Sequence, residues 1–252
     1  MVIERRHTWE DVIDDEIRAL TRNYAGRMGL RDRPALLCID NYNAVFGDRP
    51  QPLLEAMERF PSTCGQAAWD ALEPTRRLMA AARQARIPVI HTTADLANRA
   101  GGAAASATKR AISGRDAEWD FAHYPDLAPQ SGELLIRKTR ASAFYGTALS
   151  AYLVQLGVDT LVICGNSTSG CVRASVNEAF MHGYSVAIVE DCVFDRNWLS
   201  HKVNLYDMNT KYGDVIFVDE AVDFIVSHAD WPASAQLRDD RGLRAPAVAA
   251  TR

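Results

Sequence analysis

Cys171 has the sequence surroundings of a nucleophile. It follows a short apolar run rich in β-branched residues, 160–164, and the small polar loop GNSTSG, and a helical pattern begins at about Cys171 itself. The unpaired backbone N–H groups of a first helical turn carry partial positive charge, which favours a thiolate over a thiol. The same N–H groups can hold an oxyanion on a bound carbonyl. One turn of backbone is therefore expected to offer both a nucleophile and an anion hole.

The other cysteines lack this setting. Cysteine is among the most buried residue types, so a cysteine taken at random is more often inert core than nucleophile. Cys38 and Cys164 lie inside apolar runs, and we interpret both as core. Cys64 lies in a loop and Cys192 follows a predicted strand, and neither has a helix start behind it. For Cys171 the position favours the functional interpretation, but position alone leaves both interpretations open.

An acid and a cation also follow predicted strands. Asp40 ends the run ALLCID, and Lys138 comes just after the short strand 134–136. The carboxyl ends of parallel strands share one edge of a sheet, so both residues can converge with Cys171. Lys138 would stabilise the thiolate and the charge that builds during attack. Asp40 could take the thiol proton, pass it to a leaving amine and later activate water.

Each of these two residues has a simpler alternative. Asp40 could be a helix N-cap or a solvated loop acid, which is common after a strand. Lys138 could be a surface lysine whose stem lies along apolar neighbours. A Cys–His arrangement is the usual alternative chemistry, and His91, which ends the second predicted strand, is the only histidine well placed for it.

Metal and cofactor sites are not indicated. The sequence has no HxH or HExxH motif and no Cys/His cluster, the patterns that mark zinc sites. The loop GNSTSG differs from the GxGxxG fingerprint, so a dinucleotide site is weakly supported. We therefore expect the protein to need no metal and no cofactor.

The elements that must position these residues alternate regularly. Helices are predicted at 8–22, 67–86, 141–157, from about 171, within 200–213 and at 220–227, and strands at 35–40, 87–92, 134–136, 160–164, 185–189 and 214–218. The first helix has Thr8 as a plausible N-cap and an apolar side formed by Trp9, Val12, Ile13, Ile17 and Leu20. The helix after Cys171 would bury Val172, Val176, Ala179 and Phe180. This alternation predicts an α/β fold: one mostly parallel sheet of about six strands with helices on both faces.

The rest of the chain fits one domain with two appendages. Residues 1–33 are expected to form an N-terminal helical arm, 34–231 the α/β domain and 232–252 a flexible tail. The small, polar and basic stretch within 94–130 predicts a surface excursion or mobile loop. The chain has a net charge of −4 and is 48% hydrophobic. This net charge gives no electrostatic reason to expect nucleic acid or an anionic membrane as a partner.

The sequence also predicts the cellular compartment of the protein. No apolar run approaches the length that spans a membrane, and the first residues do not form a signal peptide. The five cysteines are odd in number and show no CxxC pairs. We therefore expect a cytoplasmic protein with reduced thiols.

Three segments together resemble a known family. They are ALLCID ending at Asp40, RKTRASAFYGT around Lys138 and GNSTSGCVRASVNEA around Cys171. All three are similar to segments of the isochorismatase-like cysteine hydrolases. Four segments resemble the N-carbamoylsarcosine amidase and maleamate amidase branch of that family. They are RASAF with its following GT, TSGCVR, the pair Asp195–Arg196 and NLYDMNTKYGDV. The resemblance extends over about 23–218.

This resemblance implies a three-layer α/β/α fold and a hydrolase that cleaves a C–N amide bond with release of ammonia. It implies an acyl-enzyme thioester on Cys171, with Asp40 as the base and Lys138 as its partner. It also implies a cis peptide bond between Asn166 and Ser167, where the family has an Ala-Thr pair, with the N–H groups of Ser167 and Cys171 as the oxyanion hole. No metal-binding arrangement of the kind found in relatives that cleave nicotinamide follows Asp40.

By the same resemblance, Arg196 is expected to bind the carboxylate of the substrate, because a guanidinium can form two parallel hydrogen bonds with it. A structural pair with Asp195 or a nearby surface acid is the alternative for this arginine. The branch also implies a homo-oligomer, expected to be a tetramer, with the N-terminal helix and the helix within 200–213 at the contacts.

Two classes of function follow. The leading hypothesis is an amidohydrolase for a small linear amide or carbamoyl compound that bears a carboxylate. Isochorismatase itself is an ether hydrolase without the nucleophilic cysteine, so Cys171 argues against that reaction. The alternative is a catalytically silent small-molecule-binding or thiol-redox protein on the same fold, although such a protein would have no need to keep Asp40, Lys138 and Cys171 together. The sequence does not choose between carbamoylsarcosine, maleamate and similar substrates.

Overall fold

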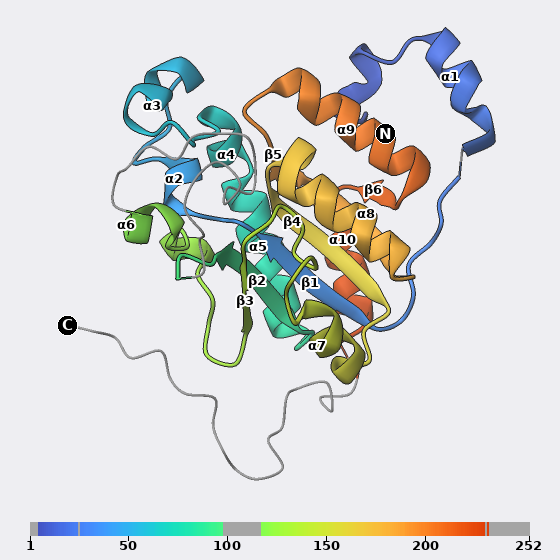
Figure 1. Cartoon of the computed structure of the whole chain (residues 1–252). Helices are drawn as coiled ribbons and strands as arrows, with labels where there is room; N and C mark the ends of the chain where they lie inside the picture. The colour runs from blue at the N-terminus through green and yellow to red at the C-terminus, as the bar shows by residue number, and fades with distance from the viewer. Residues whose placement is uncertain (1–4, 25, 98–116, 230, 232–252) are drawn as a thin grey trace.

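A six-stranded sheet forms the centre of the protein (Figure 1), which is known from a computed structural model that describes residues 5–24, 26–97, 117–229 and 231. The strand order is β3-β2-β1-β4-β5-β6, and every neighbouring pair is parallel. The strands are β1 Pro34–Ile39, β2 Val89–Ala94, β3 Leu134–Lys138, β4 Thr160–Asn166, β5 Ser185–Phe194 and β6 Asp214–Ile216. The predicted α/β fold with a parallel sheet of about six strands is confirmed.

Helices cover both faces of the sheet, and this makes three layers (Figure 1). The buried side chains of α7 Leu149–Leu156, α8 Arg173–Met181 and α9 Trp198–Lys211 pack on one face, and those of α5 Leu72–Gln84 and α10 Val218–Ser227 pack on the other. Successive residues of β1 alternate between these layers: Leu37 belongs to the first and Leu36 to the second. Both faces are covered, so all of β1 is buried and reads as a continuous apolar run.

Several helices are shorter than predicted. The expected helix 67–86 is divided at Ala71 into α4 Gln66–Asp70 and α5, and only α7 forms within the expected helix 141–157. Gly146 has a φ of +68°, a left-handed conformation that interrupts a helix before α7 begins. Two short helices, α2 Asn43–Phe46 and α3 Leu53–Arg59, lie between β1 and α4, where no helix was predicted. Phe180 on α8 is 37% exposed, so its predicted burial is wrong, whereas Val176 and Ala179 on the same helix and Val172 just before it are fully buried.

β5 is longer than predicted and extends to Phe194. Cys192 therefore lies within the strand and is fully buried, not after the strand as the sequence suggested. Within 94–130, the described residues form α6 Ala117–Phe121 and the 3₁₀ turn η4 Pro125–Leu127, which both follow the small, polar and basic stretch predicted as a surface excursion. That stretch, apart from its first two residues, and the predicted tail 232–252 lie outside the described residues.

The N-terminal segment does not form the single helix predicted at 8–22. A 3₁₀ turn, η1 Thr8–Asp11, is followed by α1 Asp15–Thr21 and by η2 Arg22–Tyr24. The Asp14 carboxylate accepts a hydrogen bond from Ile17 N at 2.9 Å, and this cap starts α1 at a new point. The predicted apolar side is divided accordingly, because Trp9 is buried whereas Leu20 is 72% exposed.

The N-terminal segment is attached to β5 and α9. The Thr8 N–H donates to Glu190 at 2.7 Å, and the His7 ring contacts the same carboxylate. Trp9 stands edge-on to Tyr206 of α9, with the ring centroids 6.3 Å apart. These contacts anchor the first residues beside the carboxyl half of β5.

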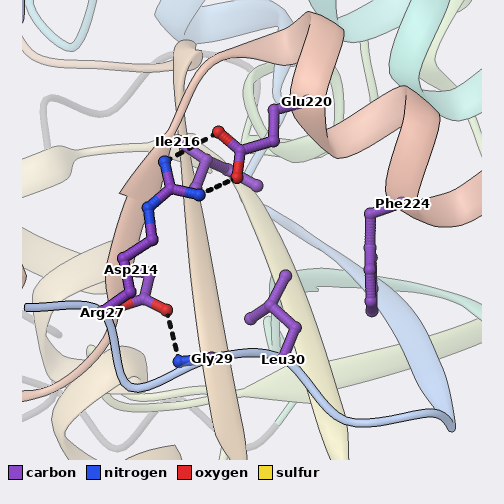
Figure 2. Close-up of a pocket in the computed structure, with 7 residues that line it drawn as sticks. All are labelled: Arg27, Gly29, Leu30, Asp214, Ile216, Glu220 and Phe224. Carbon is purple, nitrogen blue, oxygen red and sulfur yellow. Dashed lines mark hydrogen bonds and ion pairs between the residues drawn. The ribbon is translucent and has the colours of Figure 1, made fainter.

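A small hollow lies where the end of this segment passes β6 and α10 (Figure 2). The N–H groups of Met28 and Gly29 each donate to the Asp214 carboxylate at 2.9 Å, and Arg27 forms an ion pair with Glu220. The cavity measures about 240 Å³. Asp214 begins β6 and pairs with the amino half of β5, so this hollow lies away from the carboxyl edge of the sheet.

Candidate active site

The carboxyl edge of the sheet brings together Asp40, Lys138 and Cys171. Asp40 directly follows β1, Lys138 is the last residue of β3, and Cys171 lies in the π-helical turn η5 Thr168–Val172 that precedes α8. The ammonium nitrogen of Lys138 is 2.7 Å from Asp40 Oδ2 and 3.4 Å from Cys171 Sγ. The acid and the lysine are buried, and the cysteine is half-buried. The lysine therefore bridges a carboxylate and a sulfur in a site with little access to water.

The pKa values of Lys138 and Cys171 shift in this cluster. Burial lowers the pKa of Lys138, but the opposing effects of Asp40 and then of Cys171 give a net pKa above the usual value. Burial, followed by the negative charge of Asp40, raises the pKa of Cys171 to about 12, although Lys138 acts in the opposite direction. At neutral pH Cys171 is therefore a thiol. The thiolate expected from its place in a first helical turn is wrong for the resting site, because the adjacent carboxylate and the burial outweigh the partial charge of the turn.

The turn that carries Cys171 has an unusual backbone. The peptide bond between Asn166 and Ser167 is cis, and Gly170 has a non-helical φ of −115° and ψ of −106°. The carbonyl of Ser167 accepts hydrogen bonds from the N–H groups of Gly170 and Val172. Among the described residues, the Ser167 N–H has no acceptor. An N–H group without a partner beside a nucleophile is available to an oxyanion.

Two side chains from the neighbouring elements hold this turn in place. The Asp195 carboxylate, just after β5, accepts from both the N–H and the hydroxyl of Ser169 at 2.9 and 2.7 Å. His201 of α9 contacts the hydroxyl of Thr168 through Nδ1 at 2.8 Å. The Asp195 carboxylate is thus engaged by the turn, and Arg196 has other partners.

Close approach of two strands completes the site. A Cβ added to Gly165 would lie 1.9 Å from the Ile39 carbonyl oxygen, so only glycine fits at this position of β4. This contact brings the next residue, Asn166, close enough for its side-chain amide to donate to the Asp40 carbonyl. The backbone on both sides of the predicted base is therefore held by β4.

The guanidinium of Arg196 is directed at a loop. Nη1 donates to the Pro61 carbonyl at 3.1 Å and Nη2 to the Ser62 carbonyl at 2.7 Å. A guanidinium has five N–H donors, so these bonds leave donors for a further acceptor. Arg196 follows β5 and so lies at the same edge of the sheet as Asp40. Its binding of a substrate carboxylate stays a prediction.

His91 does not have the position that the sequence suggested. It lies within β2, which continues to Ala94, and its fully buried ring contacts Glu133 through Nε2 at 2.8 Å. Glu133 also accepts from Arg83 at 2.7 Å, so His91 belongs to a buried ion-pair network beneath the edge. The interpretation of His91 as a strand-end residue is therefore wrong.

Sequence reasoning missed two residues beside the acid. The hydroxyls of Thr92 and Tyr42 both donate to Asp40 Oδ1, at 2.6 and 2.7 Å. Thr92 follows His91 in β2 and carried no distinctive sequence signal. Tyr42 is two residues after Asp40, and this short spacing was the one local hint of a contact.

Comparison with known proteins places this geometry in a family. Residues 34–220 match the model of the isochorismatase domain. The chain belongs to the isochorismatase family. The solved structure of an isochorismatase-like hydrolase from Alkaliphilus metalliredigens superposes with a TM-score of 0.62 at 25% identity, over 76% of this chain and 98% of that one.

Two curated members of the family are similar in sequence. Maleamate amidohydrolase of Pseudomonas putida is 47% identical over 96 residues, which are 38% of this chain and 45% of that protein. N-carbamoylsarcosine amidase of an Arthrobacter species is 34% identical over 151 residues, which are 58% of this chain and 57% of that protein. The chain thus spans about half the length of the curated relatives that it matches.

The described residues include neither a metal-binding cluster nor a membrane-spanning helix. No group of three or more His, Cys, Asp or Glu side chains in that part of the chain is arranged to hold a metal ion. No described helix is both long and apolar enough to cross a bilayer. The expectation that the protein needs no metal stays a prediction.

Proposed function

We propose that the protein is a cysteine amidohydrolase that cleaves the C–N bond of a small linear amide or carbamoyl compound and releases ammonia through a thioester on Cys171. The observation that carries the proposal is the position of Lys138 Nζ, 2.7 Å from Asp40 Oδ2 and 3.4 Å from Cys171 Sγ. The names of the two curated relatives, an amidohydrolase and an amidase, support it.

In the first half of the reaction, Asp40 acts as general base. Because Cys171 is a thiol at neutral pH, its proton must leave as the sulfur attacks, and Asp40 is the adjacent acceptor. The sulfur forms a bond to the amide carbon, and the carbonyl oxygen becomes an oxyanion at the N–H groups of Ser167 and Cys171. Lys138 stays protonated and offsets the negative charge near the sulfur.

In the second half, the C–N bond breaks to leave a thioester, and water then hydrolyses this thioester. Asp40 returns the proton to the departing nitrogen, which leaves as ammonia, and the carbonyl carbon remains bonded to Cys171 as a thioester. Asp40 then removes a proton from a water molecule, whose oxygen attacks the same carbon. The C–S bond breaks, Cys171 recovers a proton, and the acid product leaves.

The substrate carries a carboxylate in this proposal. Arg196 provides a cation at the carboxyl edge with N–H donors left over from its bonds to the loop at 61–62. The names maleamate and N-carbamoylsarcosine in the curated relatives describe small linear amide or carbamoyl compounds that also bear an acid group. We propose a substrate of this size and charge.

Self-association is part of the same proposal. α9 exposes Trp198, Leu199 and Val203, and α1 exposes Leu20, which gives apolar surface that a second copy could cover. We propose a homotetramer with contacts through these two helices. Sedimentation at micromolar concentration is expected to give a tetramer, and a monomer would rule this out.

The test of the function is ammonia release from a panel of short amides and carbamoyl compounds with and without a carboxylate. Cys171→Ala is expected to abolish release while leaving the melting temperature close to that of the wild type. Cys64→Ala is the matched control, because Cys64 is a buried loop cysteine and should keep turnover. An acid-quenched reaction should show the acyl group on the Cys171 peptide by mass spectrometry.

Two results would contradict the proposal. Cys171→Ala that retained about a tenth of the wild-type rate would exclude covalent catalysis at this residue. A wild type that released no ammonia from any member of the panel, yet bound one of them, would favour the silent binding protein instead.

A further inference from the structure

The hydroxyl of Thr92 makes two hydrogen bonds to the same residue. It accepts from the Asp40 backbone N–H at 3.1 Å and donates to Asp40 Oδ1 at 2.6 Å. Thr92 is fully buried in β2, and Asp40 is 4% exposed. We infer that Thr92 is a positioning residue of the site, whose one hydroxyl fixes both the backbone and the carboxylate of the acid beside Cys171.

The backbone of Asp40 needs such a restraint. Its φ is +54°, a left-handed conformation that residues with a side chain adopt at a cost. The Asp40 carbonyl is held by the Tyr42 N–H at 2.9 Å and by the side-chain amide of Asn166. The N–H on the other side of the residue is held by Thr92 alone among the described contacts. Loss of that hydroxyl removes the restraint on φ.

The two carboxylate oxygens of Asp40 accept hydrogen bonds from different donors. Oδ1 accepts from the hydroxyls of Thr92 and Tyr42. Two donors occupy the favourable lone-pair directions of one oxygen. Oδ2 therefore remains for Lys138, at 2.7 Å, and for the proton of Cys171. Thr92 and Tyr42 thus determine which oxygen acts as the base.

These hydroxyls are neutral donors, so they add no charge beside the acid. The other groups that face the acid are Lys138, Cys171 and His123. His123 is largely buried, and this burial, followed by the charge of His91, lowers its pKa to about 4. Arg137 lies near His123 and acts on its pKa in the same direction. At neutral pH, Lys138 is thus the cation in contact with Asp40.

The decisive experiment compares three variants of neighbouring residues. Thr92→Val removes the hydroxyl at nearly constant shape, and Thr92→Ser keeps it. Thr93→Val is the matched control, since the Thr93 hydroxyl donates to the Phe121 carbonyl and not to the acid. Steady-state kcat and KM would be measured on the amide that the wild type hydrolyses best, and a crystal structure would be determined for each variant.

Thr92→Val is expected to lower kcat by about 10- to 100-fold with KM within about twofold, because the base is displaced while the rest of the pocket remains. Thr92→Ser should recover most of kcat, and Thr93→Val should resemble the wild type. The crystal structure of Thr92→Val should show the Asp40 carboxylate rotated away from Lys138.

The inference rests on the proposed function for its kinetic part only. If no amide is hydrolysed by the wild type, the proposed function fails, and the crystal structures still decide whether Thr92 holds Asp40. An unmoved Asp40 in Thr92→Val would overturn the inference. So would a Thr92→Val variant with the kcat of the wild type, or a Thr92→Ser variant as impaired as Thr92→Val. Should Thr92→Val fail to fold, Tyr42→Phe, which removes one of the same two donors, is expected to lower kcat with KM nearly unchanged, and a wild-type kcat would overturn the inference.

Discussion

Ser169 donates both its backbone N–H and its hydroxyl to a single carboxylate oxygen of Asp195, at 2.9 and 2.7 Å. Ser169 lies between Ser167 and Cys171, whose N–H groups form the proposed oxyanion hole, and Asp195 directly follows β5. The pair therefore connects the proposed anion-binding turn to the end of a buried strand. Hydrogen bonds to a charged acceptor are among the stronger ones in proteins, so this contact restrains the turn effectively.

Asp195→Ala is expected to lower kcat/KM by about 10²-fold, because misaligned oxyanion donors stabilise the transition state less. Ser169→Ala removes the hydroxyl and keeps the backbone bond, so its loss should stay below about tenfold. Steady-state ammonia release, with melting temperatures measured in parallel, would check both. Asp223→Ala, at an exposed position of α10, serves as the control. Asp195→Ala with activity equal to that of the control would show that the turn holds its shape without this carboxylate.

Asp40→Asn retains the shape of the side chain but cannot accept the proton. Acylation, measured in a single turnover, should slow by about 10²–10⁴-fold. His91→Ala should affect acylation less, because His91 contacts Glu133 beneath the edge of the sheet. The folded state of both variants would be checked by circular dichroism. A larger effect of His91→Ala on acylation would favour a Cys–His mechanism over the one proposed.

Arg196→Lys keeps the positive charge and loses the forked geometry. For a carboxylate-bearing substrate, kcat/KM should fall by about 10- to 100-fold. For an analogue with a neutral amide in place of the carboxylate, which the wild type should hydrolyse poorly, the further loss should be much smaller. Arg76→Lys on the exposed side of α5 is the control. Equal losses on both substrates would show that Arg196 acts by holding the loop at 61–62.

The lowered pKa of His123 predicts that the folded protein loses stability in mild acid. Burial is the main reason that its pKa falls from 6.5 to about 4. Below pH 6.5 the unfolded chain therefore binds a proton that the folded protein does not bind until about pH 4. The free energy of unfolding should consequently decrease as pH falls through this window, by about 3 kcal/mol at most from this group.

Urea unfolding at several pH values would check this. His123→Gln should make the decrease smaller, whereas His228→Gln, near the end of α10, should leave it unchanged. Parallel curves for His123→Gln and the wild type would refute the assignment to His123.

Strand ends were the part of the site that the sequence could predict. A parallel sheet covered on both faces needs continuous apolar runs, and such runs are visible in ALLCI before Asp40 and TLVIC ahead of Cys171. All parallel strands end at one edge, so a polar residue after each run is already assigned to a shared site. This rule places Asp40, Lys138 and Cys171 together without any knowledge of their distances.

Helix boundaries followed less well from the sequence. The expected helix 67–86 divides at Ala71, and the expected helix 8–22 begins anew after Asp14. The apolar periodicity indicates which side chains face inward. It does not indicate where one hydrogen-bonded segment ends and the next begins. A single cap or a glycine with positive φ determines that point locally.

The state of each site residue was decided only by the tertiary structure. Thr92 reaches Asp40 across 52 positions of sequence, and Asp195 reaches Ser169 across 26. Such contacts leave no periodic signal, because each depends on two strands that meet only in the folded sheet. The protonation of Cys171 has the same origin: helix position alone favours a thiolate, whereas burial beside Asp40 keeps the proton on the sulfur. The sequence by itself determined the fold and the edge where chemistry is expected, and the folded structure decided which atom holds each proton, since that depends on distances between residues remote in the chain.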